Sequence, residues 1–163
     1  MNDDLEIRWM QLRDVKEVLK LEDLCQGDPL LDQELLDSFA DDTFSFRVAA
    51  TKSFRSKIIG MLCCANDDNY VEIMRLSVHP GYRRQAVGTS LILSLQSRGS
   101  WGQFKEVRAV VREHDVRSQL FLKSCGLQWV ETGYDWYSHP IEDAYTFETV
   151  KAQELANGRA DRG

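Results

Sequence analysis

The residues best suited to chemistry lie in the stretch EIMRLSVHPGYRRQAVGTSLIL at 72–93, where a basic loop directly precedes a helical pattern. Arg83 and Arg84 bring two positive charges to the loop, and Ala86 and Gly88 leave little side chain between its backbone and a ligand. The first turn of a helix also carries unpaired N–H groups and the positive end of the helix dipole. Because such a corner attracts anions, the stretch predicts a site for a phosphate or diphosphate group.

A strand and a helix must position this loop. Leu76 and Val78 give the preceding segment the apolar character of a buried strand, and Pro80 ends it because proline cannot donate to a β-ladder. After Gly88, apolar residues recur over 91–95 at the three- and four-residue spacing of a helical face. The stretch is therefore expected to form strand, turn, loop and helix in that order.

This stretch resembles the acetyl-CoA-binding motif of the GNAT superfamily of N-acetyltransferases, in which an apolar strand ends in Val-x-Pro-x-Tyr-Arg. Here the motif reads Val78-His79-Pro80-Gly81-Tyr82-Arg83. The resemblance implies that the strand's backbone at Leu76, Ser77 and Val78 pairs with the pantetheine arm of the cofactor. It also implies that the diphosphate is cradled by the loop residues Arg83, Arg84, Gln85, Ala86, Val87, Gly88 and Thr89.

Ala86 departs from the family pattern, which usually has glycine at that position. Alanine permits close backbone approach but disfavours positive φ. We therefore expect the cradle to keep its shape only if Ala86 is helical or extended.

The resemblance extends to a second motif, Asn-x-x-Ala followed by Tyr-x-x-x-Gly-Phe, which contacts the cofactor arm in the family. Here Asp115 and Ser118 stand at the first part, and Leu122 replaces the tyrosine that usually serves as general acid. Gly126 stands at the glycine of the second part, so the motif aligns without a gap. In the RimI-type ribosomal-protein-alanine N-acetyltransferases a glutamate lies five residues before the asparagine, a position that is Val110 here.

The RimI-type group is the subfamily that the sequence most resembles. Tyr134-Asp135-Trp136-Tyr137, followed by Glu142-Asp143-Ala144, resembles the Asn-Tyr-Tyr…Glu-Asp-Ala loop of that group, which helps to form the acceptor channel. This implies direct transfer of acetyl from acetyl-CoA to a primary amine in a ternary complex, with a protein N-terminal α-amino group as acceptor. Small amines such as polyamines, aminoglycosides or amino acids are the alternative acceptors, and a weakly active acetyl-CoA-binding module is a further alternative.

Three residues are candidates for the missing acid and base. Glu72 lies six residues before Val78 and shares its face of the strand if no bulge intervenes. His114 follows a predicted strand and, like His79, has an unperturbed pKa suited to proton transfer. Tyr137 offers a phenol, although an aromatic channel wall is its other interpretation. An α-amino acceptor with a pKa of about 8 needs little help from a base.

The remaining segments predict the α/β (α+β) GNAT fold, with a mixed, mostly antiparallel central sheet of about six to seven strands flanked by about four helices. A polar, aromatic loop is expected to join the last two strands. Residues 1–150 are expected to form one domain and 151–163 a polar tail. Outside the central segment, strands are expected over 5–12, 44–48, 58–65, 106–111, 127–132 and 144–150.

Composition limits the class of protein. The net charge of −6 over 163 residues argues against non-specific nucleic-acid binding. The spacing of the four cysteines matches no metal motif, so buried free thiols in a reducing cytoplasm and no metal are expected. No signal peptide or membrane span is recognised, and the cytoplasm is the expected location. A monomer or homodimer is expected.

Overall fold

The computed structural model describes residues 4–25, 32–53, 56–96 and 106–149. Over these residues the chain forms seven strands and four α-helices, with two short 3₁₀ turns. In chain order the elements are β1 (Leu5–Trp9), η1 (Leu12–Asp14), α1 (Val15–Cys25), α2 (Asp32–Ala40), β2 (Phe44–Thr51), β3 (Ile58–Asn66), β4 (Tyr70–Val78), η2 (Pro80–Tyr82), α3 (Val87–Gln96), β5 (Glu106–Arg112), α4 (Val116–Ser124), β6 (Leu127–Ser138) and β7 (Ile141–Thr149).

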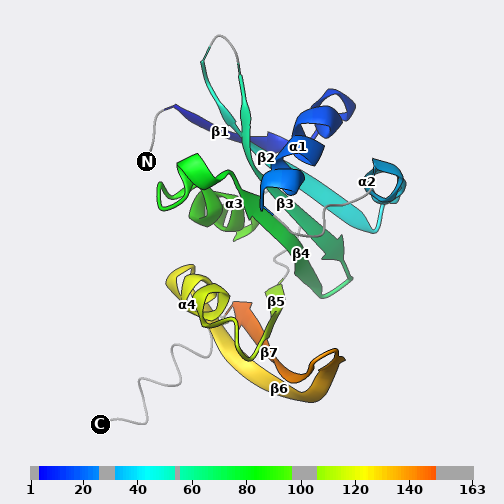
Figure 1. Cartoon of the computed structure of the whole chain (residues 1–163), viewed down its shortest axis with the longest axis vertical. Helices are drawn as coiled ribbons and strands as arrows, with labels where there is room; N and C mark the ends of the chain where they lie inside the picture. Colours follow the sequence, from blue (N-terminus) through cyan, green and yellow to red (C-terminus); the bar gives the residue numbers. More distant parts are fainter. Residues whose placement is uncertain (1–3, 26–31, 54–55, 97–105, 150–163) are drawn as a thin grey trace.

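The seven strands form one sheet in the order β1-β2-β3-β4-β5-β7-β6. Neighbours run antiparallel except for β4 and β5, which are parallel and pair only over Tyr70–Ile73 and Glu106–Ala109. Beyond Ile73 the two strands diverge, so the sheet splits at its centre (Figure 1). The predicted fold class, a mixed and mostly antiparallel sheet flanked by helices, is confirmed.

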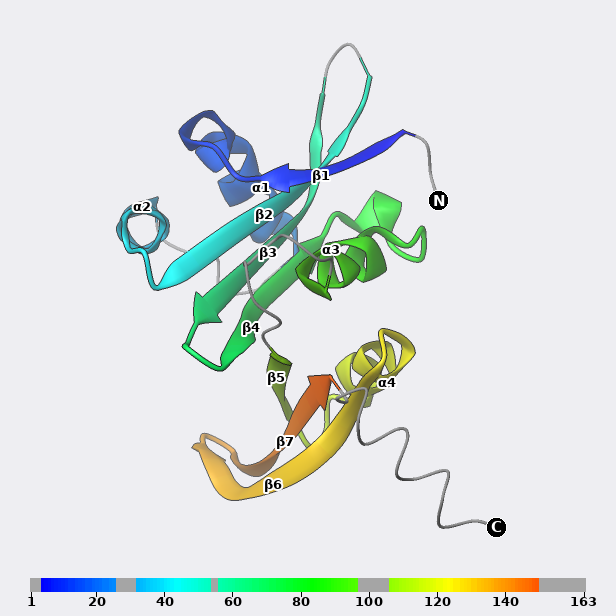
Figure 2. The ribbon, with the colours of Figure 1, turned by 180° about the vertical axis from the view of Figure 1, so that it is seen from behind.

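Two cores lie on opposite faces of the sheet. On one face α3 and α4 pack their apolar side chains, among them Leu91, Ile92 and Leu122, against the strands (Figure 2). On the other face α1 and α2 bury Val18, Leu21 and Leu35. Cys63 and Cys64 belong to different cores, as the alternation of side chains along a strand predicts.

Helix α4 is bounded by the residues that the sequence indicates. The Asp115 carboxylate accepts a hydrogen bond from the Ser118 backbone N–H at 3.0 Å, which satisfies one of the unpaired donors of the first turn. At the other end Gly126 has φ +89°, a conformation that glycine adopts without strain. Both ends of the helix are thereby fixed, and with them the position of the residues along it.

The last two strands are longer than predicted. Residues 133–138 were expected to lie in a loop, but they continue β6, which pairs with β7 through Ser138 opposite Ile141. Register shifts at Trp129/Glu131 and Gly133/Tyr137 accommodate the extra residues of β6, so 134–136 have no partner in the ladder and pairing resumes at Tyr137 opposite Glu142. The expected tail over 151–163 lies outside the described residues.

The four cysteines are free thiols, three of them buried and Cys25 partly buried. Among the described residues, no group of histidine, cysteine and carboxylate side chains is arranged to hold a metal ion. No helix in the described ranges is long and apolar enough to cross a bilayer.

Candidate active site

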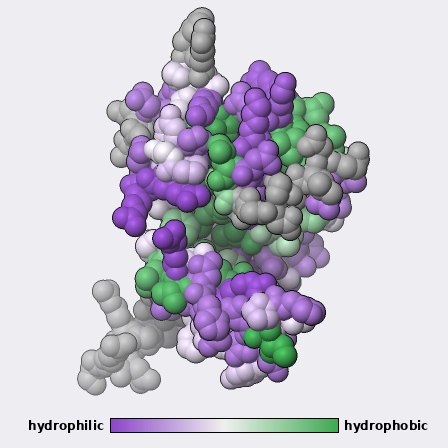
Figure 3. Space-filling model, in the orientation of Figure 1, coloured by the Kyte–Doolittle hydropathy of each residue, from purple (hydrophilic) through white to green (hydrophobic). Residues whose placement is uncertain are grey.

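A cleft of about 1160 Å³ lies where β4 and β5 diverge. It is lined by residues from the end of β4, the loop before α3, the first turns of α3, the end of β5, α4 and one residue of β6. Figure 3 shows apolar surface in the hollow between the two parts of the molecule. Residues from both faces of the sheet line the cleft, with Cys25 and Arg75 on the α1 side and Val87 on the α3 side.

The loop before α3 is held by its own hydrogen bonds. The Gly81 backbone N–H donates to His79 Nδ1 at 3.1 Å, and Arg83 Nε donates to the Val78 carbonyl at 3.1 Å. A Cβ added at Gly88 would lie 3.1 Å from Phe121 Cζ, closer than most real contacts. Glycine at this position therefore keeps the backbone at the start of α3 open toward the cleft.

Ala86 does not meet the condition set for the cradle, a helical or extended backbone. Its φ is +60°, as is that of Arg84, so two side-chain-bearing residues of the loop lie in the left-handed region. The chain reverses direction sharply here to start α3, whose first hydrogen bond runs from Ser90 N–H to the Ala86 carbonyl at 2.8 Å. The loop adopts this conformation at some cost in backbone strain.

Most of the residues expected to bind the cofactor do line the cleft. The structure brings together Leu76, Ser77, Val78, Arg83, Arg84, Ala86, Val87, Gly88, Thr89, Asp115, Ser118 and Leu122. Gln85 does not join them, because its side chain turns to the other side of the loop and donates to the Gly81 carbonyl at 3.1 Å.

Glu72 is not in the cleft. Met74 is bulged out of the ladder with β3, since Cys63 pairs with Arg75 and Cys64 with Ile73. The bulge reverses the alternation, so Ile73 shares the α3 face with Val78 and Glu72 lies on the opposite face. The prediction that Glu72 shares a face with Val78 is therefore wrong, for the reason that a one-residue bulge shifts side chains to the other face.

His114 also lies outside the cleft. Its side chain is 81% exposed, and its Nδ1 lies 3.0 Å from an oxygen of Glu142. Glu142 accepts from the His114 backbone N–H and from Arg112, both at 2.9 Å, and these bonds lower the pKa of its carboxyl to about 2. The structure gives this histidine a hydrogen-bond partner at the surface and does not place it in the lining of the cleft. His79, as part of the loop turn, likewise does not line the cleft.

Tyr137 lines the cleft from β6, with its ring against the Arg112 guanidinium at 3.8 Å. The neighbouring aromatic side chains are exposed, Tyr134 at 80% and Trp136 at 63%. A Cβ at Gly133 would lie 2.6 Å from Trp136, so that ring packs directly over the glycine backbone. The aromatic residues that the sequence singled out therefore extend from the cleft toward solvent.

Arg75 and Cys25 are among the residues of the cleft that sequence reasoning missed. Arg75 pairs with the fully buried Glu22 of α1 at 2.9 Å. The Cys25 thiol donates to the Val78 carbonyl at 3.2 Å, and burial raises its pKa. A signal for Glu22 was present, because it falls on the apolar face of α1 with Val18 and Leu21, where a carboxylate needs a partner.

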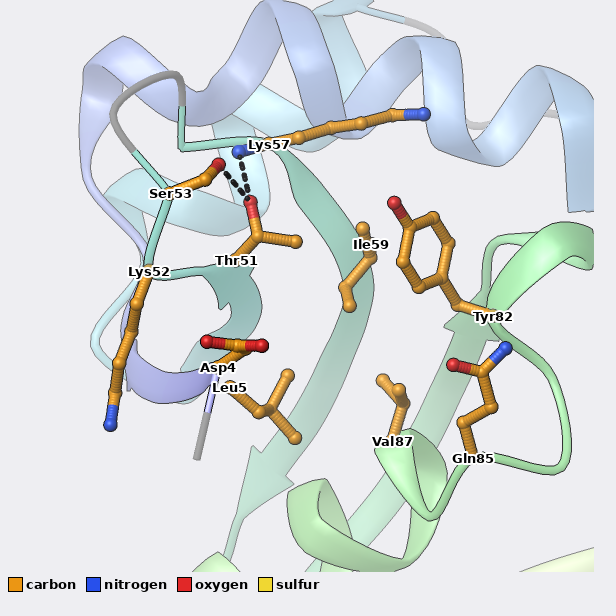
Figure 4. Close-up of a pocket in the computed structure, with 10 residues that line it drawn as sticks. All are labelled: Asp4, Leu5, Thr51, Lys52, Ser53, Lys57, Ile59, Tyr82, Gln85 and Val87. Atoms are coloured by element: carbon orange, nitrogen blue, oxygen red, sulfur yellow. Dashed lines mark hydrogen bonds between the residues drawn. The ribbon is translucent and has the colours of Figure 1, made fainter. Parts of the chain in front are cut away.

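A second, smaller hollow of about 500 Å³ lies on the α3 face, beside the same loop (Figure 4). Its floor is apolar, formed by Leu5, Ile59 and Val87, and the hydroxyl of Tyr82 points into it. Tyr82 and Val87 also line the cleft, so the loop and the first residue of α3 form the wall between the two hollows.

The structure is similar to solved acetyltransferases. The ribosomal-protein-S18-alanine N-acetyltransferase of Escherichia coli superposes with a TM-score of 0.71 at 16% identity, over 89% of this chain and 92% of that one. Spermidine/spermine N-acetyltransferase SpeG of Vibrio cholerae gives 0.72 at 13% identity, over 96% and 98%. NAA60 of Arabidopsis thaliana, solved with acetyl-CoA, gives 0.73 at 14% identity, over 88% and 97%. At these identities the likeness establishes the fold.

The sequence itself decides the family. None of the curated protein sequences compared with the chain matches it. Residues 12–127, however, match the family model described as the acetyltransferase (GNAT) family. That range contains β4, the loop before α3, α3, β5 and α4, which are the elements that build most of the cleft. The chain therefore belongs to the acetyltransferase (GNAT) family and is an acetyltransferase.

Proposed function

We propose that this enzyme transfers the acetyl group of acetyl-CoA to the α-amino group of a protein N-terminus, by direct attack in a ternary complex. The observation that carries the proposal is a cleft lined from both faces of the sheet. On the α3 face of the sheet, the lining includes the basic loop that we infer binds an anion. On the α1 face, the lining residues described include arginines and an aromatic side chain but no carboxylate.

The donor side fits acetyl-CoA. The backbone N–H groups at the start of α3 and the side chains of Arg83 and Arg84 are suited to hold a diphosphate. The pairing of β4 with β5 ends at Ile73, so the edge of β4 over Met74–Val78 faces the cleft and can pair with the amide-bearing pantetheine arm. An N–H of that edge is also placed to polarise the thioester carbonyl.

The charge of the lining residues favours an acceptor that is not polycationic. Among those described, the one carboxylate is that of Asp115, which is occupied in capping α4. The arginines outnumber it and are spread around the whole cleft. A polyamine would meet repulsion here and would find no acidic partner. The arginines are Arg75, Arg83, Arg84, Arg112 and Arg117.

The acceptor's own pKa supports an α-amine. With Val110 and Leu122 at the positions usually taken by the base and the acid, no carboxylate of the lining is available to deprotonate the amine. An α-amino group has a pKa of about 8 and an alkyl amine about 10.4, so at pH 7 the α-amine is neutral roughly two hundred times more often. The site can therefore use α-amines and would use polyamines poorly.

We assign Tyr137 the role of general acid, which donates a proton to the thiolate of the departing CoA. It is the phenol that lines the cleft from the acceptor side, and Arg112 fixes its ring. The apolar side chains of Val110 and Leu122 exclude water around the reacting carbonyl. Replacing Tyr137 with phenylalanine should lower kcat and leave the Kd for acetyl-CoA unchanged.

The apolar residues Val110 and Leu122 also favour a second candidate function, an acetyl-CoA-binding module of low activity. Both functions require that the protein bind acetyl-CoA, but only the enzyme would transfer the acetyl group to an acceptor. A module would bind acetyl-CoA through the same loop and transfer acetyl to none of the acceptors offered.

The test is release of free CoA thiol in the presence of N-terminal peptides or spermidine, together with a titration of acetyl-CoA binding. We expect turnover on peptides, a rate that rises with pH up to about 8 as the amine deprotonates, and the same pH profile in Glu72→Gln. Gly88→Leu should weaken acetyl-CoA binding, because its side chain would meet Phe121, whereas Gly81→Ala, whose Cβ would lie 3.4 Å from His79, serves as the matched control. Faster turnover of spermidine would contradict the proposal, and binding without turnover would favour the module.

A further inference from the structure

Arg75 and Glu22 form an ion pair at the acceptor side of the cleft. Arg75 lies on β4, two residues beyond the point where β5 diverges, and its side chain is 28% exposed. Glu22 lies on α1 and its side chain is completely buried. The Arg75 NH1 group donates to Glu22 Oε2 at 2.9 Å.

The regular alternation of side chains at the end of β4 determines which way Arg75 faces. Ile73, Leu76 and Val78 pack with the α3 core, while Arg75 turns to the opposite face and meets α1. The anion-binding loop and α3 occupy the donor face, so an acceptor amine must approach the thioester from the face of α1. Arg75 therefore lies on the acceptor's path, at the edge of the gap between the strands.

Arg112 flanks the same gap from β5. The neighbouring Val111 packs with the α3 core, so Arg112 also turns to the acceptor face, where it is paired with Glu142 and covered by Tyr137. Each strand thus presents one arginine to the acceptor. The Arg112 guanidinium is occupied by its two neighbours, whereas Arg75 has Glu22 as its one partner among the described residues.

The buried carboxylate of Glu22 fixes the guanidinium of Arg75 without covering it. One oxygen of Glu22 holds one nitrogen of Arg75, and the other oxygen has no hydrogen-bond partner in the described part of the chain. A guanidinium has five N–H donors in a planar fork that matches a carboxylate. Because Glu22 anchors one nitrogen of the Arg75 guanidinium, the other N–H donors of that group are held in a defined direction beside the cleft.

We propose that Arg75 determines acceptor specificity by binding a carboxylate that lies next to the reacting amine. This inference rests on the proposed function. The carboxylate can come from an acidic side chain near the start of a peptide or from the α-carboxylate of a free amino acid. Both place an anion a few bonds from an amine, which is the arrangement that a single fixed guanidinium recognises.

The test compares matched acceptors that differ in one carboxylate. Peptide amides beginning Ala-Glu and Ala-Gln form one pair, and alanine and alaninamide, each compared at equal concentration of neutral amine, form the other. We expect the wild-type enzyme to favour the carboxylate member of at least one pair by about tenfold or more in kcat/KM, as expected for a charge-assisted hydrogen bond. The pair that shows the preference identifies the source of the carboxylate.

Arg75→Gln should bring this ratio close to one, because the glutamine side chain keeps polarity but lacks the charge and the fork. The ratio does not depend on how much of the enzyme is folded, so a structural role alone would not change it. Arg75→Lys keeps a positive charge for Glu22 and protects the fold, and it should retain only part of the preference. Arg13→Gln, which removes an exposed arginine that does not line the cleft, is the control and should leave the ratio unchanged.

Three results would overturn the inference. Equal kcat/KM within both pairs for the wild-type enzyme would refute it and leave the proposed function standing. A preference that survives in both Arg75 variants would assign it to another residue. Acetyl-CoA binding without turnover of any acceptor would overturn the proposed function, and this inference with it.

Discussion

The left-handed backbone of Ala86 leads to a prediction that runs against the usual effect of glycine. A side-chain-bearing residue in this region is destabilised by about 1–2 kcal/mol, because its Cβ crowds the following carbonyl. Glycine is free of that strain but loses about 0.5–1 kcal/mol through the greater freedom of the unfolded chain. Ala86→Gly should therefore raise the free energy of unfolding by about 0.5–1 kcal/mol. For a chain of this size that is a rise in Tm of about 1–4 °C.

The matched control is Ala65→Gly, in β3, where the alanine has ordinary strand geometry. There the same substitution should lower stability by about 0.5–1 kcal/mol. Urea unfolding of the parent, Ala86→Gly and Ala65→Gly gives both changes in the free energy of unfolding in one series. The Kd for acetyl-CoA should be the same in Ala86→Gly and the parent, because the loop already has the required shape. A loss of stability in Ala86→Gly equal to that in Ala65→Gly would refute the strain argument.

Three further predictions concern other parts of the molecule. The pKa of the Glu142 carboxyl is lowered from 4.5 to about 2, so the ionised group stabilises the fold above pH 4.5 and loses that contribution as the pH falls toward 2. In Glu142→Gln, the free energy of unfolding measured with urea should therefore depend less on pH over this interval. Burial raises the pKa of Cys63 to about 12, so a thiol reagent should modify Cys25 first in the native protein, and acetyl-CoA should slow that reaction because Cys25 lines the cleft. Gly133→Ala would place a Cβ 2.6 Å from Trp136 and displace that ring, which should shift the tryptophan fluorescence and raise the acceptor KM without changing the Kd for acetyl-CoA.

The strand, loop and helix on the proposed donor side of the cleft could be predicted from the sequence because they depend on local chemistry. Pro80 and Gly88 mark a strand end and a helix start within about ten residues, with the basic loop between them. Asp115 and Gly126 fix α4 in the same way, through a side-chain cap and a left-handed residue. The cleft residues contributed by these segments lie where the motif placed them, apart from Gln85.

The rest of the cleft lining depends on tertiary pairing and could be predicted only in part. The bulge at Met74 is set by the pairing of β4 with β3, and it moves Glu72 onto the α1 face, away from Val78. The partnership of Arg75 with Glu22 joins residues 53 positions apart in the chain. The apolar face of α1 indicates that Glu22 needs a partner, but only the packed structure shows that this partner is Arg75.

The left-handed conformation of Ala86 shows a different limit of sequence reasoning. Propensity disfavours it, yet the turn into α3 requires it. Tertiary structure overrides the local preference, at a position where the loop faces the cleft. The residue that departs from the family pattern is therefore also one at which the loop carries backbone strain.

Acetylation of α-amines by this enzyme is tested most directly by locating the acetyl group on a product. A peptide that begins with alanine and carries an internal lysine offers both kinds of amine in one molecule. After incubation with the enzyme and acetyl-CoA, fragmentation in a mass spectrometer assigns the modified nitrogen. We expect acetylation of the α-amino group and none of the lysine. Acetyl on the lysine, or no acetylated peptide from an enzyme that binds acetyl-CoA, would contradict it.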